Sequence, residues 1–85
     1  MDKVGTLSER ALFAYNTKHL AYKDKVRFYY ALKGREGNAG IIQSASIEQL
    51  GKTVLLVPKE QAANVEDFLK FWKCAFTRRR VILDE

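Results

Sequence analysis

Cationic and aromatic side chains alternate over residues 25–33 of this 85-residue chain, which read KVRFYYALK. A period of two is typical of a strand, in which every second side chain points to the same face. Lysine and arginine contact phosphates, and an aromatic ring stacks on an unpaired base with about 1–3 kcal/mol. The segment therefore predicts a nucleic-acid-binding strand face, although an ordinary solvated face has the same composition. Its contact residues would be Lys25, Arg27, Tyr29 and Lys33, with Arg35 in the loop that follows.

Three consecutive arginines near the C-terminus form a second basic cluster. In a strand, Arg78 and Arg80 share one face and Arg79 points to the other. Val81 and Leu83 share the face of Arg79. Planar guanidinium groups match phosphate geometry well, so all three arginines are candidate nucleic-acid contacts. The alternative is an edge strand on which charge prevents aggregation.

Catalytic and metal-binding constellations are not expected from the remaining residue types. The single cysteine, Cys74, and the single histidine, His19, cannot form a four-ligand zinc site, and Cys74 fits a buried apolar position. The triplet Gly51-Lys52-Thr53 lacks the upstream glycine of a phosphate-binding loop. No nucleophile–base pair or pair of carboxylates stands out. We therefore expect a protein without catalytic activity, cofactor or bound metal.

The net charge of +5 is concentrated in two blocks of the chain. Residues 18–35 contain six basic residues and one acid, residues 70–80 contain five basic residues and no acid, and the remainder is acidic overall. If the fold joins the blocks, they form one positive face, which would attract phosphate backbones, acidic proteins or anionic lipid. No apolar run approaches the ~20 residues of a membrane span. A lone cysteine fits a reducing compartment, so a cytoplasmic location is expected.

Two helices are predicted, one near each end of the chain. Residues 7–18 begin with a capping-box pattern, Thr6-Leu7-Ser8-Glu9, and continue with apolar residues at helical spacing. Residues 59–73 repeat apolar side chains at three- and four-residue steps. In that segment Glu66 precedes Lys70 by four residues, the order that favours a helical ion pair.

Strands are expected between and after these helices. The segments are 25–33, 41–47 beyond a glycine-rich loop over 34–40, the apolar run 53–57, and 75–83. For 25–33 the alternative is another helix that ends at Gly34. The resulting order is α-β-β-β-α-β. It predicts one α+β domain over 1–85, with a mostly antiparallel sheet, helices packed on one face, and residues 1–5 as a loose end.

The first five of these elements, α-β-β-β-α, resemble in their order the double-stranded-RNA-binding domains. That family carries a Lys-Lys-x-x-Lys cluster at the start of its second helix. The corresponding segment here, Lys59-Glu60-Gln61-Ala62-Ala63, offers one lysine. The family's binding residues are therefore not carried over to this chain.

Together these features predict a small, non-catalytic nucleic-acid-binding module, such as a ribosome-associated component of a ribonucleoprotein. RNA is favoured over DNA because no basic recognition helix is visible in the pattern. The alternative is a protein–protein adaptor or homodimeric subunit. Its interface candidate is Phe71, because the helix over 59–73 is too apolar to bury all of its rings. A DNA-binding protein of the chromatin type is a second alternative.

Overall fold

The computed structural model describes residues 7–35 and 37–84, and the loose end predicted for 1–5 lies outside them. The elements are β1 (Leu7–Tyr15), α1 (Tyr22–Lys33), β2 (Gly34–Arg35), β3 (Asn38–Ala39), α2 (Ile41–Ser44), β4 (Glu48–Gly51), β5 (Val54–Pro58), the 3₁₀ turn η1 (Lys59–Gln61), α3 (Ala62–Phe71) and β6 (Phe76–Asp84). A four-stranded antiparallel sheet with helices makes this an α+β fold, as the sequence predicts.

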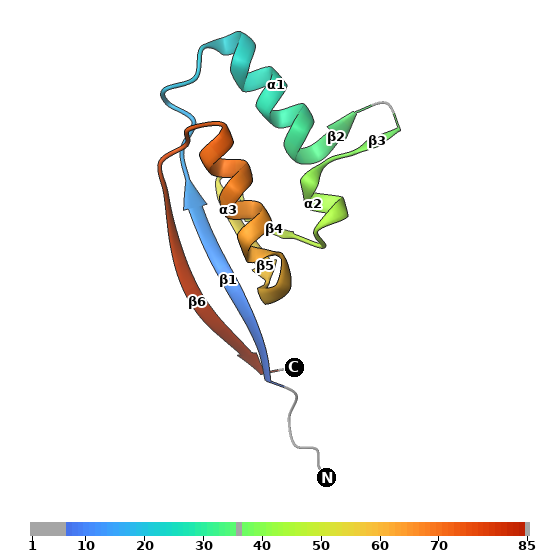
Figure 1. Cartoon of the computed structure of the whole chain (residues 1–85), viewed down its shortest axis with the longest axis vertical. Helices are drawn as coiled ribbons and strands as arrows, with labels where there is room; N and C mark the ends of the chain where they lie inside the picture. The colour runs from blue at the N-terminus through green and yellow to red at the C-terminus, as the bar shows by residue number, and fades with distance from the viewer. Residues whose placement is uncertain (1–6, 36, 85) are drawn as a thin grey trace.

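The main sheet has the strand order β4-β5-β1-β6, and all neighbours are antiparallel (Figure 1). Strands β1 and β4 are therefore parallel with β5 between them, and β5 and β6 are parallel with β1 between them. These are two split β-α-β units, the arrangement of ferredoxin-like folds. Right-handed crossovers place the connecting helices on the same face of the sheet. Figure 1 shows α3 in front of the strands and α1 towards one end of the sheet.

The core fills the space between the helices and one face of the sheet. Strand β1 contributes the alternate residues Ala11, Phe13 and Tyr15, and β5 contributes Leu55 and Val57, all of them buried. The helices complete the cluster with the buried side chains Phe28, Leu32, Val65 and Leu69. Full burial of such a side chain contributes about 1.5–3 kcal/mol, so this layer determines how the helices sit on the sheet.

The helix predicted for 7–18 is wrong, because residues 7–15 form the central strand β1. The leucine, glutamate, arginine and alanine in this segment are good helix formers, so the local pattern misleads. Tertiary pairing overrides this preference, since β1 pairs with β5 on one side and with β6 along its whole length on the other. In the supposed capping box, Glu9 lies in the strand and Thr6 lies outside the described residues.

The alternating segment 25–33 belongs to α1, so the strand prediction is wrong and the alternative that ends at Gly34 is correct. Phe28 and Leu32 are fully buried, and their four-residue spacing fits both a helix and a strand. Tyr30 distinguishes the two, because in a strand it would be buried with them but here it is 43% exposed. Gly34 ends the helix with a φ of 93° and donates its N–H to the Tyr30 carbonyl.

The strand predicted for 41–47 is also wrong, since Ile41–Ser44 is the short helix α2. It follows the hairpin of β2 and β3, which lies within the glycine-rich segment. At Gly40 a Cβ atom would lie 2.3 Å from the Leu32 carbonyl oxygen, so this turn requires glycine. With these corrections the resemblance to double-stranded-RNA-binding domains is lost, because the described chain starts with a strand.

The remaining predicted elements are confirmed with small changes of bounds. The apolar run 53–57 corresponds to β5, an internal strand with Leu55, Leu56 and Val57 buried. The helix predicted for 59–73 is η1 followed by α3. The strand predicted for 75–83 is β6, which lies at an edge of the sheet.

Candidate nucleic-acid interface

Helix α1 carries the predicted contact residues on two of its sides. Lys25, Tyr29 and Lys33 follow one another at four-residue steps, so they share a side of the helix. Arg27 is exposed on a different side. Arg35 lies in β2, and its side chain falls outside the described part of the structure. The fold thus brings three of these five residues together, by helical rather than strand spacing.

The shared side of α1 borders an open pocket of about 320 Å³, called the Tyr29 pocket below. It is lined by Tyr29 and Lys33 from α1, Gln49 from β4, and Lys52 from the β4–β5 turn. Its volume lies at the lower end of the ~300–1,000 Å³ typical of small-molecule sites, which suits a single nucleobase. Gln49 offers an amide donor and acceptor for a base edge. The sequence pattern contained no signal for Gln49, and Lys52 stood out only as part of the Gly-Lys-Thr triplet.

The Tyr29 ring is held between two side chains of its own helix. It packs edge-on against Phe28, with ring centroids 5.7 Å apart and an interplanar angle of 72°. The Lys33 ammonium lies 5.6 Å from the Tyr29 centroid, a cation–π contact of about 0.5–1 kcal/mol at an exposed site. Base stacking contributes more, about 1–3 kcal/mol. An incoming base would therefore displace the ammonium and leave Lys33 to contact a phosphate.

The β4–β5 turn that carries Lys52 is anchored to the end of β1. The Tyr15 hydroxyl donates to the Lys52 carbonyl oxygen at 3.3 Å, and the Tyr15 N–H donates to the Thr53 carbonyl oxygen at 3.0 Å. Burial above all, followed by the neighbouring Tyr29 and Cys74, raises the pKa of Tyr15 to about 12. The hydroxyl therefore stays protonated at neutral pH and remains a donor to the turn.

Cations around α1 make no ion pair with any described residue. They are Lys18, Lys23, Lys25, Arg27 and Lys33, with Lys52 across the Tyr29 pocket. Asp24, the one acid between residues 18 and 35, lies in the first turn of α1, where it complements the helix dipole. This basic block is therefore available to phosphate groups.

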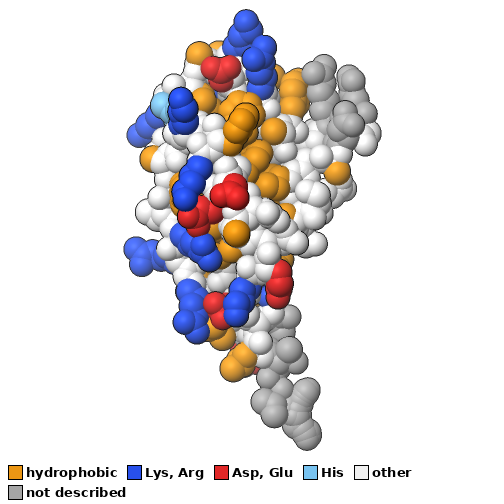
Figure 2. Space-filling view, in the orientation of Figure 1, with side chains coloured by type: hydrophobic (Ala, Val, Ile, Leu, Met, Phe, Trp, Pro, Cys, Tyr) orange, Lys and Arg blue, Asp and Glu red, His pale blue; other side chains and the backbone are white. Residues whose placement is uncertain are grey.

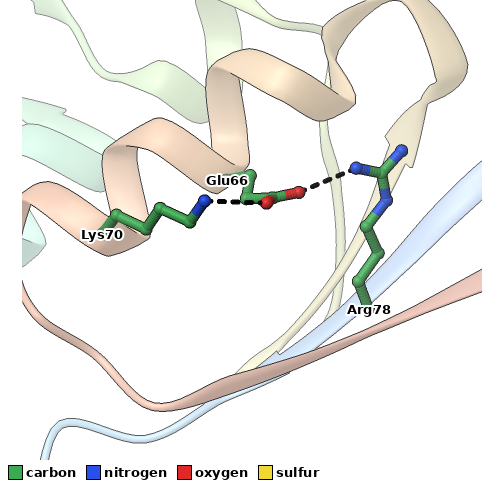
Figure 3. Close-up of polar contacts among 3 residues, drawn as sticks. All are labelled: Glu66, Lys70 and Arg78. Carbon is green, nitrogen blue, oxygen red and sulfur yellow. Dashed lines mark hydrogen bonds and ion pairs between the residues drawn. The ribbon is translucent and has the colours of Figure 1, made fainter.

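In the second basic block, on α3 and β6, several cations form ion pairs with acids. Glu66 accepts a hydrogen bond from Arg78 at 2.7 Å and lies 3.1 Å from the Lys70 ammonium (Figure 3). Hydrogen bonding from Arg78, and then from Lys70, lowers the pKa of Glu66, so this carboxylate is charged at neutral pH. The helical ion pair predicted between Glu66 and Lys70 is confirmed.

A second acid neutralises two further cations beside β6. Glu9 lies 3.4 Å from Arg80 and 3.7 Å from Lys59, and all three border a small pocket of about 90 Å³. The register confirms that Arg78 and Arg80 share one face of β6 while Arg79 points to the other. Within the described chain, Arg79 is the member of the triplet without an ion pair.

The two basic blocks do not form one uniformly positive face. Figure 2 shows Lys and Arg side chains along one edge of the helix-covered face, with Asp and Glu side chains among them near α3 and β6. The sequence allowed a single positive face if the fold joined the two blocks, and that condition is not met because Glu9 and Glu66 lie among the cations of the second block. The candidate interface is the surface formed by the cations of α1 and the Tyr29 pocket, called the α1 surface, where the cations make no ion pair within the described part of the chain.

Three other residues singled out in the sequence do not line the Tyr29 pocket. Phe71 is 77% exposed beside Trp72, with ring centroids 5.6 Å apart, so its predicted exposure is confirmed. Cys74 is buried as predicted, and burial raises the pKa of its thiol. His19 precedes α1, and its Nε2–H donates to the Trp72 carbonyl oxygen at 2.8 Å.

Over 7–35 and 37–84, no three His, Cys, Asp or Glu side chains are grouped so as to hold a metal ion. None of the described helices has the length and apolar character needed to cross a membrane.

Comparison with known proteins adds no functional assignment. No family model matches the chain, and neither the curated proteins nor the solved structures contain a match. The function has to be inferred from the geometry of the α1 surface.

Proposed function

We propose that this protein binds single-stranded nucleic acid, RNA in the first place, through the α1 surface and the Tyr29 pocket. One observation carries the proposal: Lys33 and Lys52, which form no ion pair with any residue the structure describes, meet the Tyr29 ring at a pocket of nucleobase size. In this proposal the protein is a non-catalytic component of a ribonucleoprotein. A cytoplasmic location belongs to the same proposal.

Each residue of the pocket has a distinct part in such a complex. A base stacks on Tyr29, and Gln49 hydrogen-bonds to its edge. Lys33 and Lys52 contact the phosphates on either side of that base. Arg27, on the neighbouring side of α1, is exposed and contacts a further phosphate of the bound nucleic acid.

A single strand suits this site better than a duplex, because a base must leave its stack to enter the pocket. The helix-free face of the sheet supplies no stacking platform, since its central residues are Leu12, Ala14, Val54 and Leu56. The sequence argument against DNA, the lack of a basic helix, no longer holds because α1 is such a helix. RNA stays the first choice, since it is recognised mostly through unpaired, splayed-out bases.

Fluorescence anisotropy with labelled oligonucleotides tests the proposal. We expect salt-sensitive binding of single-stranded RNA, and weaker binding of single-stranded DNA, duplex RNA and duplex DNA. Lys33→Ala combined with Lys52→Ala removes two phosphate contacts. This double variant should bind about tenfold more weakly and lower the slope of log affinity against log salt by about 1.4.

The matched control is Lys59→Ala combined with Lys70→Ala, which removes the same charge from the ion-paired block. Because these lysines already face Glu9 and Glu66, we expect at most about a twofold loss of affinity. Absence of binding to any oligonucleotide at low salt would refute the proposal. Equal losses in the two double variants would also refute it, because the α1 surface would then have no special role.

A protein partner is the second candidate function, favoured by the exposure of Phe71. Figure 2 shows hydrophobic side chains gathered between α1 and α3, and apolar patches of this kind mark protein contacts. Phe71→Asp should abolish a complex that buries Phe71 and leave RNA binding intact. Loss of RNA binding in this variant would count against separate surfaces for the two functions.

A further inference from the structure

The sheet face opposite the helices is mostly aliphatic. Strand β1 turns Leu12 and Ala14 to this face, and β5 turns Val54 and Leu56 to it. Leu56 is 8% exposed and Leu12 is half-buried, yet neither belongs to the core cluster on the helix side. The described helices bury their apolar residues in that one cluster. The aliphatic face is therefore a surface that a second layer of structure could cover.

One row of residues across this face has an acid at one end and a base at the other. From β4 to β6, the strand register aligns Glu48, Leu56, Leu12 and Arg79. Glu48 and Arg79 are exposed, and neither makes an ion pair with a described residue. Two leucines are thus flanked by unpaired opposite charges at the same height along the strands.

This row is complementary to itself under a two-fold rotation about an axis parallel to the strands. The rotation lays the sheet of a second copy face to face on the first and reverses the strand order, so β4 lies opposite β6 and β5 opposite β1. It introduces no shift along the strands. Glu48 therefore meets the second copy's Arg79, and Leu56 meets the second copy's Leu12, at both ends of the interface.

The neighbouring rows are compatible with this approach. The next row contains the small side chains Ala14, Val54 and Thr77, so two sheets can pack at the usual separation of about 10 Å. In the row on the other side, Arg10 donates a hydrogen bond to the Ser8 hydroxyl of its own strand. That contact directs the guanidinium along β1 rather than straight out from the face.

We propose that this face forms the interface of a symmetric homodimer. A second copy is the favoured occupant because a two-fold interface must be self-complementary, and the charges of this row satisfy that condition. Four strands about 4.8 Å apart and about five residues long cover roughly 330 Å² per copy. Stable interfaces bury about 800 Å² per partner, so the dimer should be weak and form at micromolar or higher concentration.

Analytical ultracentrifugation of the full chain without nucleic acid, over a concentration series, tests this interface. The unaltered protein should show a reversible monomer–dimer equilibrium. Glu48→Lys and Arg79→Glu each place like charges opposite one another at both ends of the interface, and each should weaken the dimer about tenfold or more. Arg79→Glu also lowers the net charge, which by itself favours association. Loss of the dimer in that variant therefore reports the contact itself.

An equimolar mixture of the two variants provides the sharpest arm of the test. The introduced lysine of one copy then faces the introduced glutamate of the other, and the remaining Arg79 faces the remaining Glu48. The heterodimer should regain the affinity of the unaltered protein. Arg27→Glu makes the same charge change on α1 and should retain the dimer. Thermal melting of each variant confirms that its fold is intact.

A monomer at every concentration would overturn the proposal, as would a dimer that Arg79→Glu leaves unchanged. A dimer lost in Phe71→Asp but kept in Arg79→Glu would place the contact on α3 and overturn it too. All of these measurements are made without RNA. Their failure therefore leaves the proposed nucleic-acid binding untouched, and failure of RNA binding leaves the dimer untouched.

Discussion

The α1 surface and the second basic block, on α3 and β6, come from segments of equal net charge, but their cations differ in how far acids neutralise them. Residues 18–35 and residues 70–80 each carry a net charge of +5. Around α1 the cations have no acidic partner among the described residues, whereas two β6 arginines each share a carboxylate with a lysine. Those carboxylates come from Glu9 and Glu66, outside the second block. The charge that a ligand meets is therefore set by the tertiary neighbours of each cation.

The ion pairs change the charge that a ligand meets much more than they change the free energy of unfolding. Exposed ion pairs such as those of Glu66 contribute little to the free energy of unfolding, so one partner can be removed without unfolding the chain. Mutations and changes of pH can therefore alter each of the two surfaces separately, and the four predictions below use both.

The largest expected effect distinguishes the half-buried Tyr29 ring at its pocket from the exposed Phe71 ring on α3. Tyr29→Ala should weaken single-stranded RNA binding by about tenfold or more, because it removes a stacked base contact of about 1–3 kcal/mol. Tyr29→Phe keeps the ring and should bind almost normally. Phe71→Ala, beside the ion-paired Lys70, is the matched control and should have no effect on affinity. Equal losses for Tyr29→Ala and Phe71→Ala in the anisotropy titration would contradict a specific role for the Tyr29 pocket.

Alkaline pH should lower the free energy of unfolding through deprotonation of Tyr15, whose hydroxyl holds the turn that carries Lys52. The pKa of Tyr15 is raised to about 12 from 10.0, so its contribution to stability is complete below pH 10.0 and is lost as the pH rises towards 12. We expect a loss of about 1–2 kcal/mol in the free energy of unfolding. Urea titrations at a series of pH values should show this slope in the unaltered protein and not in Tyr15→Phe. Identical slopes would mean that Tyr15 does not titrate in this way.

Removing an acid from the paired block should make it resemble the α1 surface. Glu66→Gln leaves Arg78 and Lys70 without their carboxylate, and RNA affinity at low salt should rise about two- to threefold. Glu60→Gln makes the same charge change at an acid without an ion pair among the described residues. It therefore measures how much RNA affinity rises from the change in net charge alone. An affinity gain no greater than that of Glu60→Gln would show that pairing with Glu66 does not keep Arg78 and Lys70 from contacting RNA.

The smallest expected effect is the acid sensitivity of the same carboxylate. The pKa of Glu66 is lowered from 4.5, chiefly by its hydrogen bond from Arg78, so its stabilisation is present above pH 4.5 and is lost as the pH falls below that value. The midpoint of thermal unfolding should therefore fall slightly less steeply with acidification in Glu66→Gln than in the unaltered protein. A steeper fall in Glu66→Gln would reverse the assigned sign.

The sequence pattern grouped three of the candidate residues on one side although it assigned them to the wrong element, a strand in place of α1. Lys25, Tyr29 and Lys33 share a side in either conformation, because a four-residue step fits both the strand period and the helix period. Arg27 stands two residues from Lys25 and Tyr29, a step that keeps a shared face only in a strand. For this reason it separates from the others on α1. Gln49 was beyond reach, because only the pairing of β4 with β5 brings it to α1.

The local pattern was sufficient for the α+β class, the buried strand β5, the helix α3 with its Glu66–Lys70 pair, and the alternation of the three arginines on β6. Each of these depends on contacts within a few residues or on uniform burial, which periodicity reports directly. Tertiary structure alone decided that residues 7–15 form a strand, because pairing with β5 and β6 outweighs their helical preference. It also decided that Arg78 and Arg80 are neutralised, because Coulomb attraction depends on distance in space, and only the fold brings Glu66 and Glu9 to β6.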